Sequence, residues 1–140
     1  MAKLIILLSF LLSFEAYSAE WKIITDDSGK SYLQNKNISQ KKFEIKKAMG
    51  KSNFIRAKKI NKEYQLLIYV SGVAGTSNIV QLTNAAIFNT KTKSIIGDYP
   101  YAYISLTENK KIAQPKWIIK KNEILIKDES IDLNKKIILK

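Results

Sequence analysis

The chain of 140 residues contains no cysteine and no histidine. A protein that lacks both has no thiol nucleophile, no nucleophile–imidazole pair and no ordinary set of zinc ligands. It also forms no disulfide bonds, so its fold must be held by buried apolar side chains. We therefore expect a protein that is not an enzyme and that needs neither a metal nor another cofactor.

Arginine is nearly absent as well: Arg56 is the only one, although the formal net charge is +12. Recognition of nucleic acids depends heavily on the bidentate contacts that arginine makes to phosphates and bases. The sequence therefore argues against nucleic acid as the partner. Its richness in lysine, asparagine and isoleucine is typical of an AT-rich bacterial genome.

The first residues have the pattern of a signal peptide. Lys3 precedes an apolar run over residues 4–14 that only serines interrupt, and the small residues Ala16, Ser18 and Ala19 follow. The run is well short of the roughly 20 apolar residues that span a bilayer. We predict a cleaved signal peptide over residues 1–19, with Glu20 as the first mature residue and no membrane span after cleavage. The protein is then exported to the bacterial periplasm or, alternatively, to the cell exterior.

The stretch over residues 63–89 organises the rest of the chain. Two apolar runs, residues 64–70 and 79–88, flank a segment of small residues at 71–77. The first run is apolar at both alternating sets of positions, as expected for a strand that is covered on both faces. We predict that this stretch forms the central β-hairpin of the domain, with the strand 64–70 deep in the sheet.

Other short apolar runs, separated by turn-forming residues, also predict strands. The pattern of residues 38–49 fits either a strand or one short helix. We expect a single β-rich domain over residues 20–140, an all-β fold that is a small antiparallel β-sandwich or a partly closed barrel of about seven to nine strands. The additional predicted strands are Trp21–Thr25, Ser31–Gln34, Asn53–Ala57, Ser94–Ile96, Tyr99–Leu106, Trp117–Ile119, Glu123–Ile126 and Lys136–Leu139.

Two features are candidate surfaces for a protein partner. The loop 71–77 is longer than a tight hairpin turn requires, and its small side chains would let another surface approach the backbone closely. A row of alternating tyrosines offers large contact area, although packing within the sheet is the alternative. Pro100 places the tyrosine strand at an edge or a bulge. The candidate partner-binding residues are Gly72, Val73, Ala74, Gly75, Thr76, Tyr99, Tyr101 and Tyr103.

The segment from Lys36 to Lys62 is dense in lysine, and Glu44 is its single acidic residue. Such a density of charge creates a positive potential that attracts anionic partners. The simpler interpretation is a solvated face that keeps the protein soluble. The candidate anion-binding residues are Lys41, Lys42, Lys46, Lys47, Lys51, Arg56, Lys58 and Lys59.

Together these features predict a non-enzymatic, exported binding protein of the bacterial envelope. The preferred partner is a protein, which it would neutralise as an inhibitor or immunity protein neutralises an enzyme or toxin that acts in the periplasm. The alternative is a polyanion-binding protein or adhesin that recognises lipopolysaccharide, a cell-wall polymer or a host glycan, or a lipid headgroup, through Lys36–Lys62. Binding of a polyanion would weaken steeply with salt, whereas a partner interface built on Tyr101, Tyr103 and the loop would weaken much less.

Overall fold

The computed structural model describes residues 20–38 and 40–140. The predicted signal peptide, residues 1–19, lies outside the described residues. Within them the chain forms eleven strands and two single turns of 3-10 helix, η1 (Lys36–Ile38) and η2 (Glu129–Ile131), with no α-helix. This confirms the all-β prediction. The strands are β1 (Trp21–Thr25), β2 (Ser31–Asn35), β3 (Lys42–Glu44), β4 (Asn53–Lys59), β5 (Tyr64–Ala74), β6 (Val80–Asn89), β7 (Ser94–Ser105), β8 (Lys110–Lys111), β9 (Lys116–Lys120), β10 (Glu123–Asp128) and β11 (Leu133–Ile138).

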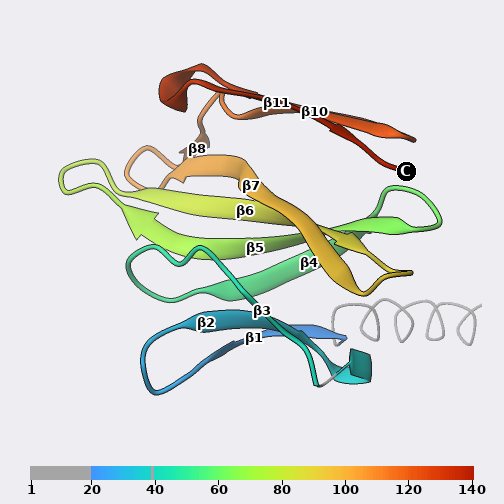
Figure 1. Cartoon of the computed structure of the whole chain (residues 1–140). Helices are drawn as coiled ribbons and strands as arrows, with labels where there is room; N and C mark the ends of the chain where they lie inside the picture. The colour runs from blue at the N-terminus through green and yellow to red at the C-terminus, as the bar shows by residue number, and fades with distance from the viewer. Residues whose placement is uncertain (1–19, 39) are drawn as a thin grey trace, which may run out of the picture.

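Three antiparallel sheets form three stacked layers (Figure 1). The middle layer, the central sheet, has the strand order β4-β5-β6-β7-β8. The N-terminal sheet, β1-β2-β3, lies on one side of it, and the C-terminal sheet, β11-β10-β9, lies on the other. The strands outnumber those predicted because β3 and β8 are too short to give a periodic pattern.

β5 supplies core side chains to both faces of the central sheet. Leu66 and Ile68 belong to the core beneath the C-terminal sheet, whereas Leu67 and Tyr69 belong to the core beneath the N-terminal sheet. All four side chains are at most 2% exposed. Successive side chains of a strand point to opposite faces, so this uninterrupted apolar run is buried on both sides, as the sequence predicts.

Aromatic contacts attach the N-terminal sheet to the central sheet. Trp21 of β1 and Phe43 of β3 both meet Phe88 of β6 edge-on, with ring centroids 5.0 and 5.8 Å apart. Leu33 of β2 is fully buried in the same core. Each edge-to-face pair of this kind contributes about 0.5–1.5 kcal/mol beyond the burial of its area.

The C-terminal sheet is attached at both of its ends. At one end the Trp117 ring meets the Tyr101 ring at 5.3 Å, and its indole N–H donates to the carbonyl of Pro100 at 2.8 Å. At the other end the hydroxyl of Tyr64 donates to the backbone oxygen of Lys140, the last residue, at 3.0 Å. The sheet is therefore fixed to both β5 and β7.

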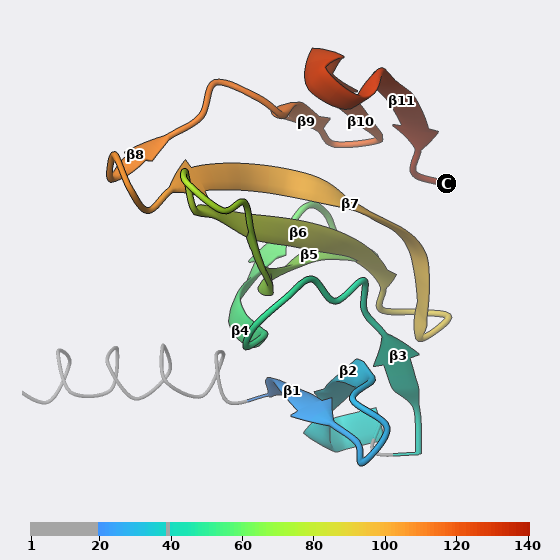
Figure 2. The same ribbon diagram turned by 90° about the vertical axis from the view of Figure 1, so that its left-hand side faces the viewer.

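Four register shifts curl the central sheet (Figure 2). The extra residues are Ile55 in β4, Ser71 in β5, and Ile96 and Tyr101 in β7. Each bulge increases the local twist. Pro100 lies beside the Tyr101 bulge, as predicted. The two strands expected at 94–96 and 99–106 form the single strand β7, which continues through the Ile96 bulge.

The segment after η1 is extended, which resolves the choice between strand and helix for residues 38–49. β3 pairs with β2, and Ile45 is buried in the core beneath the N-terminal sheet. The amide of Ala48 then donates to the carbonyl of Ser71 at 2.8 Å. The backbone groups of this segment are thus bonded to other strands, and no helix forms in its described part.

Past the Ser71 bulge, β5 pairs with β6 on one side and with Met49 on the other. The amide of Val73 donates to the carbonyl of Met49 at 2.8 Å. Gly72, which directly precedes Val73, has a φ of +144°. A Cβ at this position would lie 2.3 Å from the Met49 carbonyl oxygen. Gly72 is therefore required by the backbone of the strand.

We expect Gly72→Ala to lower the free energy of unfolding by about 3 kcal/mol, because it adds a backbone clash to an unfavourable φ. Gly29→Ala is the matched control: Gly29 also has a positive φ, +86°, but nothing lies within 4 Å of the added Cβ. The control should cost about 1 kcal/mol. Urea unfolding measures both values, and equal losses would show that the approach of Met49 imposes no constraint.

Candidate functional site

The connection between β5 and β6 begins later than the predicted loop at residues 71–77. β5 extends to Ala74 and β6 begins at Val80, so the connection consists of residues 75–79. Gly72 is buried within β5 rather than displayed on a loop. The difference arises because β5 resumes its pairing with β6 after the Ser71 bulge and keeps it as far as Ala74 and Val80.

This connection projects beyond the neighbouring strands at one end of the molecule (Figure 1), and Figure 2 views that end face on. Its residues are exposed from Ala74 to Asn78. Gly75 has a φ of +97°, and a Cβ there would lie 2.1 Å from the carbonyl oxygen of Asn78. Glycine thus allows the turn to close. Of the predicted partner-binding residues, Val73, Ala74, Gly75 and Thr76 lie together here.

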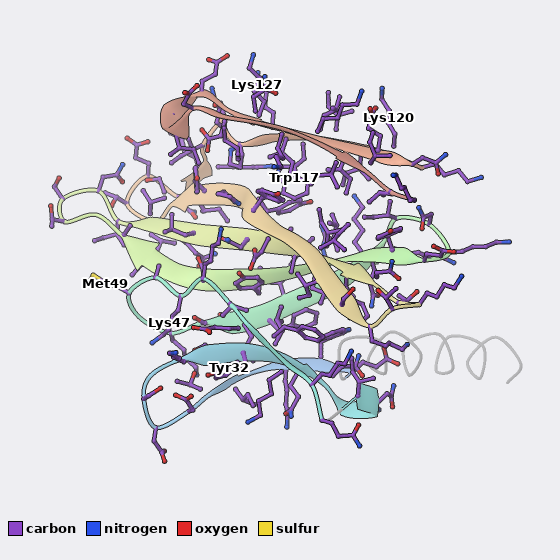
Figure 3. All side chains as sticks on the ribbon, viewed as in Figure 1. Tyr32, Lys47, Met49, Trp117, Lys120 and Lys127 are labelled. Atoms are coloured by element: carbon purple, nitrogen blue, oxygen red, sulfur yellow. The ribbon has the colours of Figure 1, made fainter. Side chains whose placement is uncertain are left out.

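Exposed apolar side chains flank the connection on both sides. Met49, which pairs with Val73, is 78% exposed, and Figure 3 shows it at this end of the molecule. Leu106 is 48% exposed, and its amide donates to the carbonyl of Ile79 at 2.8 Å. We call the surface formed by residues 73–79 with Met49 and Leu106 the hairpin tip.

Hydrogen bonds to the end of β7 hold the hairpin tip in place. The amide of Ile79 donates to Oγ1 of Thr107 at 3.1 Å. The hydroxyl of Ser105 donates to Oδ1 of Asn78 at 2.9 Å and accepts from the amide of Glu108 at 3.1 Å. The tip is therefore ordered before a partner arrives, which reduces the entropic cost of binding.

A polar network lies within the central sheet, several residues along the strands from the hairpin tip. The hydroxyl of Tyr69 donates to Oδ2 of Asp98 at 2.5 Å, and the side-chain amide of Asn84 donates to Oδ1 at 3.3 Å. The Ser71 hydroxyl is 3.4 Å from Oδ1 of Asn84. The Lys46 ammonium donates to the backbone carbonyl of Asp98 at 3.5 Å. The network ties β5, β6 and β7 to the connection between β3 and β4.

Burial raises the pKa of the Asp98 carboxyl above its ordinary value of 3.8, and the hydrogen bonds from Tyr69 and Asn84 and the charge of Lys46 oppose this rise in part. Burial, followed by the charge of Asp98, also raises the pKa of Tyr69, so its hydroxyl remains a donor. The folded protein therefore binds the Asp98 proton more tightly than the unfolded chain does. The stability that this group contributes is present at low pH and is lost as the pH rises through the raised pKa.

The predicted tyrosines lie mostly beneath the C-terminal sheet, and each is half-buried. Tyr99 and Tyr101 pack against the core there, and the ring of Tyr99 covers Gly97. Burial, followed by the neighbouring Asp128 carboxylate, raises the pKa of Tyr103 to about 12. Each ring keeps only part of its surface for a partner, and a binding role for them stays a prediction.

The predicted anion-binding side chains are spread over three parts of the molecule. The first is β4, the edge strand of the central sheet, where charged side chains discourage pairing with another chain. The second is the N-terminal sheet, where the Lys42 ammonium lies 5.8 Å from the ring centre of Tyr32. The third comprises the residue just before β3 and the connection from β3 to β4. By part, these residues are Arg56, Lys58 and Lys59; Lys42; and Lys41, Lys46, Lys47 and Lys51.

Within residues 20–38 and 40–140, no group of three acidic side chains is placed to hold a metal ion. The same residues contain no helix of the length and apolarity that crossing a membrane requires. No protein-family model, curated protein or solved structure matches the chain. The arrangement of the chain's own side chains is therefore what indicates a function.

The sequence pattern alone does not predict three residues of the hairpin tip, Met49, Ile79 and Leu106. Ile79 reads as the start of an apolar strand, and Leu106 as the end of another. Met49 stands in a lysine-rich segment, immediately before Gly50. An isolated apolar residue before a glycine is the only signal, and it does not say that Met49 lies beside Val73.

The hydrogen bond between Tyr69 and Asp98 should make the effect of Tyr69→Phe depend on pH. Above the raised pKa of Asp98 the variant loses a donor to a carboxylate, at a cost of about 2 kcal/mol, whereas below pH 3.8 the acceptor is neutral and the cost falls to about 1 kcal/mol. Ser52→Ala is the control, because the Ser52 hydroxyl donates to the backbone carbonyl of Ser71 at 3.1 Å, a neutral acceptor at both pH values. Urea unfolding at both pH values should show a pH-independent cost for the control. A pH-independent cost for Tyr69→Phe as well would mean that Asp98 is never ionised in the folded protein.

Proposed function

We propose that this protein is a non-enzymatic, exported binding protein of the bacterial envelope that captures a partner protein with its hairpin tip. The observation that carries the proposal is the position of Met49 and Leu106, two largely exposed apolar side chains on either side of a projecting, hydrogen-bonded connection. Within the described residues, 78% of Met49 and 48% of Leu106 stay exposed.

The composition of the hairpin tip suits a protein partner. Residues 73–79 include no charged side chain, and charged residues are depleted at the cores of protein interfaces, where methionine is enriched. The flexible thioether side chain of Met49 adapts to an irregular apolar surface. Small residues between Met49 and Leu106 leave the backbone open to close contact.

The projecting shape supports an inhibitor or immunity role. A narrow hairpin end fits a cleft in the partner better than a flat face, and clefts are where enzymes bind their substrates. The bonds from Ser105 and Thr107 fix the connection in advance, as tight binding of an inhibitor requires. We infer that the partner is an enzyme or toxin that acts in the periplasm and that the hairpin tip blocks its cleft.

The polyanion alternative receives less support from the geometry. The lysines from Lys36 to Lys62 face several parts of the molecule, and two of them are engaged: the ammonium groups of Lys41 and Lys46 donate to backbone carbonyls of Lys93 and Asp98. A polyanion needs a continuous positive surface to release many counterions at once. Binding through the hairpin tip should change little when salt is raised, because residues 73–79 carry no charge.

Crosslinking from the hairpin tip identifies the partner. The chain has no cysteine, so Thr76→Cys places a unique thiol on the tip for attachment of a photocrosslinker. Lys91→Cys does the same in the turn between β6 and β7, at the opposite end of that hairpin. We expect a specific crosslinked protein from position 76 and none from position 91.

The affinity of the purified pair then tests the site. Met49→Ser combined with Leu106→Ser should weaken binding by at least about tenfold, because exposed apolar anchors of an interface are lost. Ile118→Ser combined with Ile138→Ser is the matched control, since these side chains are 55% and 52% exposed on the C-terminal sheet. Calorimetry measures both affinities. Equal weakening by the two double variants, or none by the first, would contradict the proposed site.

A further inference from the structure

The outer face of the C-terminal sheet carries a regular array of side chains. The inward positions of β10, Ile124 and Ile126, are at most 1% exposed, so the alternate positions of the sheet point outward. Neighbouring outward residues follow from the strand register. Across β9, β10 and β11 they are Lys116, Lys127 and Asn134; Ile118, Leu125 and Lys136; and Lys120, Glu123 and Ile138.

Lysine dominates this array. It holds four lysines against one acid, Glu123, whose carboxylate lies 3.0 Å from the Lys136 ammonium and 3.6 Å from that of Lys120. Lys127 is 3.3 Å from Glu129, which belongs to η2. Figure 3 shows Lys120 and Lys127 directed away from the body of the molecule. The face therefore keeps a net positive charge.

Apolar side chains stand among these lysines. Ile118 on β9 and Ile138 on β11 are 55% and 52% exposed, and Leu125 on β10 is half-buried between them. The array contains no aromatic residue and no arginine, the residues that dominate hot spots in protein interfaces. Lysine, in contrast, is depleted from such interfaces.

We propose that this face binds the surface of an anionic lipid bilayer. Its lysines would contact lipid phosphates, and the alkyl stems of these lysines, together with Ile118 and Ile138, would enter the headgroup region. A second copy of the chain is a poor occupant, because lysines would oppose lysines. The proposal concerns a different surface from the hairpin tip, which points along the layers rather than away from them (Figure 1), so it stands independently of the proposed function.

Vesicle binding tests the proposal. Every variant is expressed from the whole sequence and purified in the form that the cell produces. Any effect of residues 1–19 on vesicle binding is therefore the same for all variants. The probes are vesicles of pure phosphatidylcholine and of equal parts phosphatidylcholine and phosphatidylglycerol. Cosedimentation should show binding to the anionic vesicles only, with an affinity that falls as salt is raised.

The variant Lys116→Gln combined with Lys127→Gln should bind anionic vesicles about 30-fold more weakly, since each lysine near such a surface contributes about fivefold. Lys22→Gln combined with Lys30→Gln is the matched control: it removes the same charge from exposed lysines of β1 and of the turn that follows it and should leave binding unchanged. Ile118→Ser combined with Ile138→Ser should weaken the binding that remains at high salt.

Three outcomes would overturn the proposal. The unchanged protein could fail to bind anionic vesicles. The two lysine double variants could weaken binding equally, which would indicate attraction by net charge alone. The C-terminal face could bind a soluble polyanion such as heparin with the same lysine dependence while not binding vesicles, which would make a glycan its ligand. Failure of hairpin-tip binding would bear on none of these, because the readouts and the variants are separate.

Discussion

The burial of both faces of β5 is the constraint on which the three-layer architecture depends. A strand that is apolar at nearly every position cannot leave one face in water without exposing a row of large side chains. Leu66 and Leu67 are both fully buried, each toward a different outer sheet. Both outer sheets are therefore needed to cover the central one. In a chain without disulfide bonds, this double cover supplies the stabilisation that cross-links give to many small exported domains.

The same arrangement explains where the charges lie. Each outer sheet has only three strands, whereas the central sheet has five. The outer faces of the two outer sheets and the edges of the central sheet remain in water. Lysine side chains occupy these faces and edges. The hairpin tip differs, because residues 73–79 carry no charge and two exposed apolar side chains flank them. The molecule thus separates an uncharged projection from a flat basic face. Binding at the first would depend on apolar contact and binding at the second on salt.

Much of this fold follows from the periodicity of the sequence, because burial on both faces leaves a clear mark on β5 and the alternating strands after it. The hairpin tip was only partly predictable. The alternation of β5 does not reveal the bulge at Ser71, the pairing with β6 that resumes after it, or the bridge between Val73 and Met49. The positions of Tyr99 and Tyr101 beneath the C-terminal sheet likewise depend on how separate layers pack. Local pattern determines these strands, whereas contacts between distant segments determine the surfaces.

The network around Asp98 shows how the core positions the candidate site. Replacing a buried carboxylate and its partners with apolar side chains is often neutral or favourable for stability, so stability alone does not account for this group. What the network adds is a fixed geometry: the Tyr69 and Asn84 bonds hold β7 against β5 and β6, while Lys46 bonds to the Asp98 backbone. Lys46 lies three residues before Met49, so the segment that displays Met49 is anchored to the core. A fixed position for β7 and for the segment that carries Met49 is a physical reason to keep a polar group that the core itself does not need.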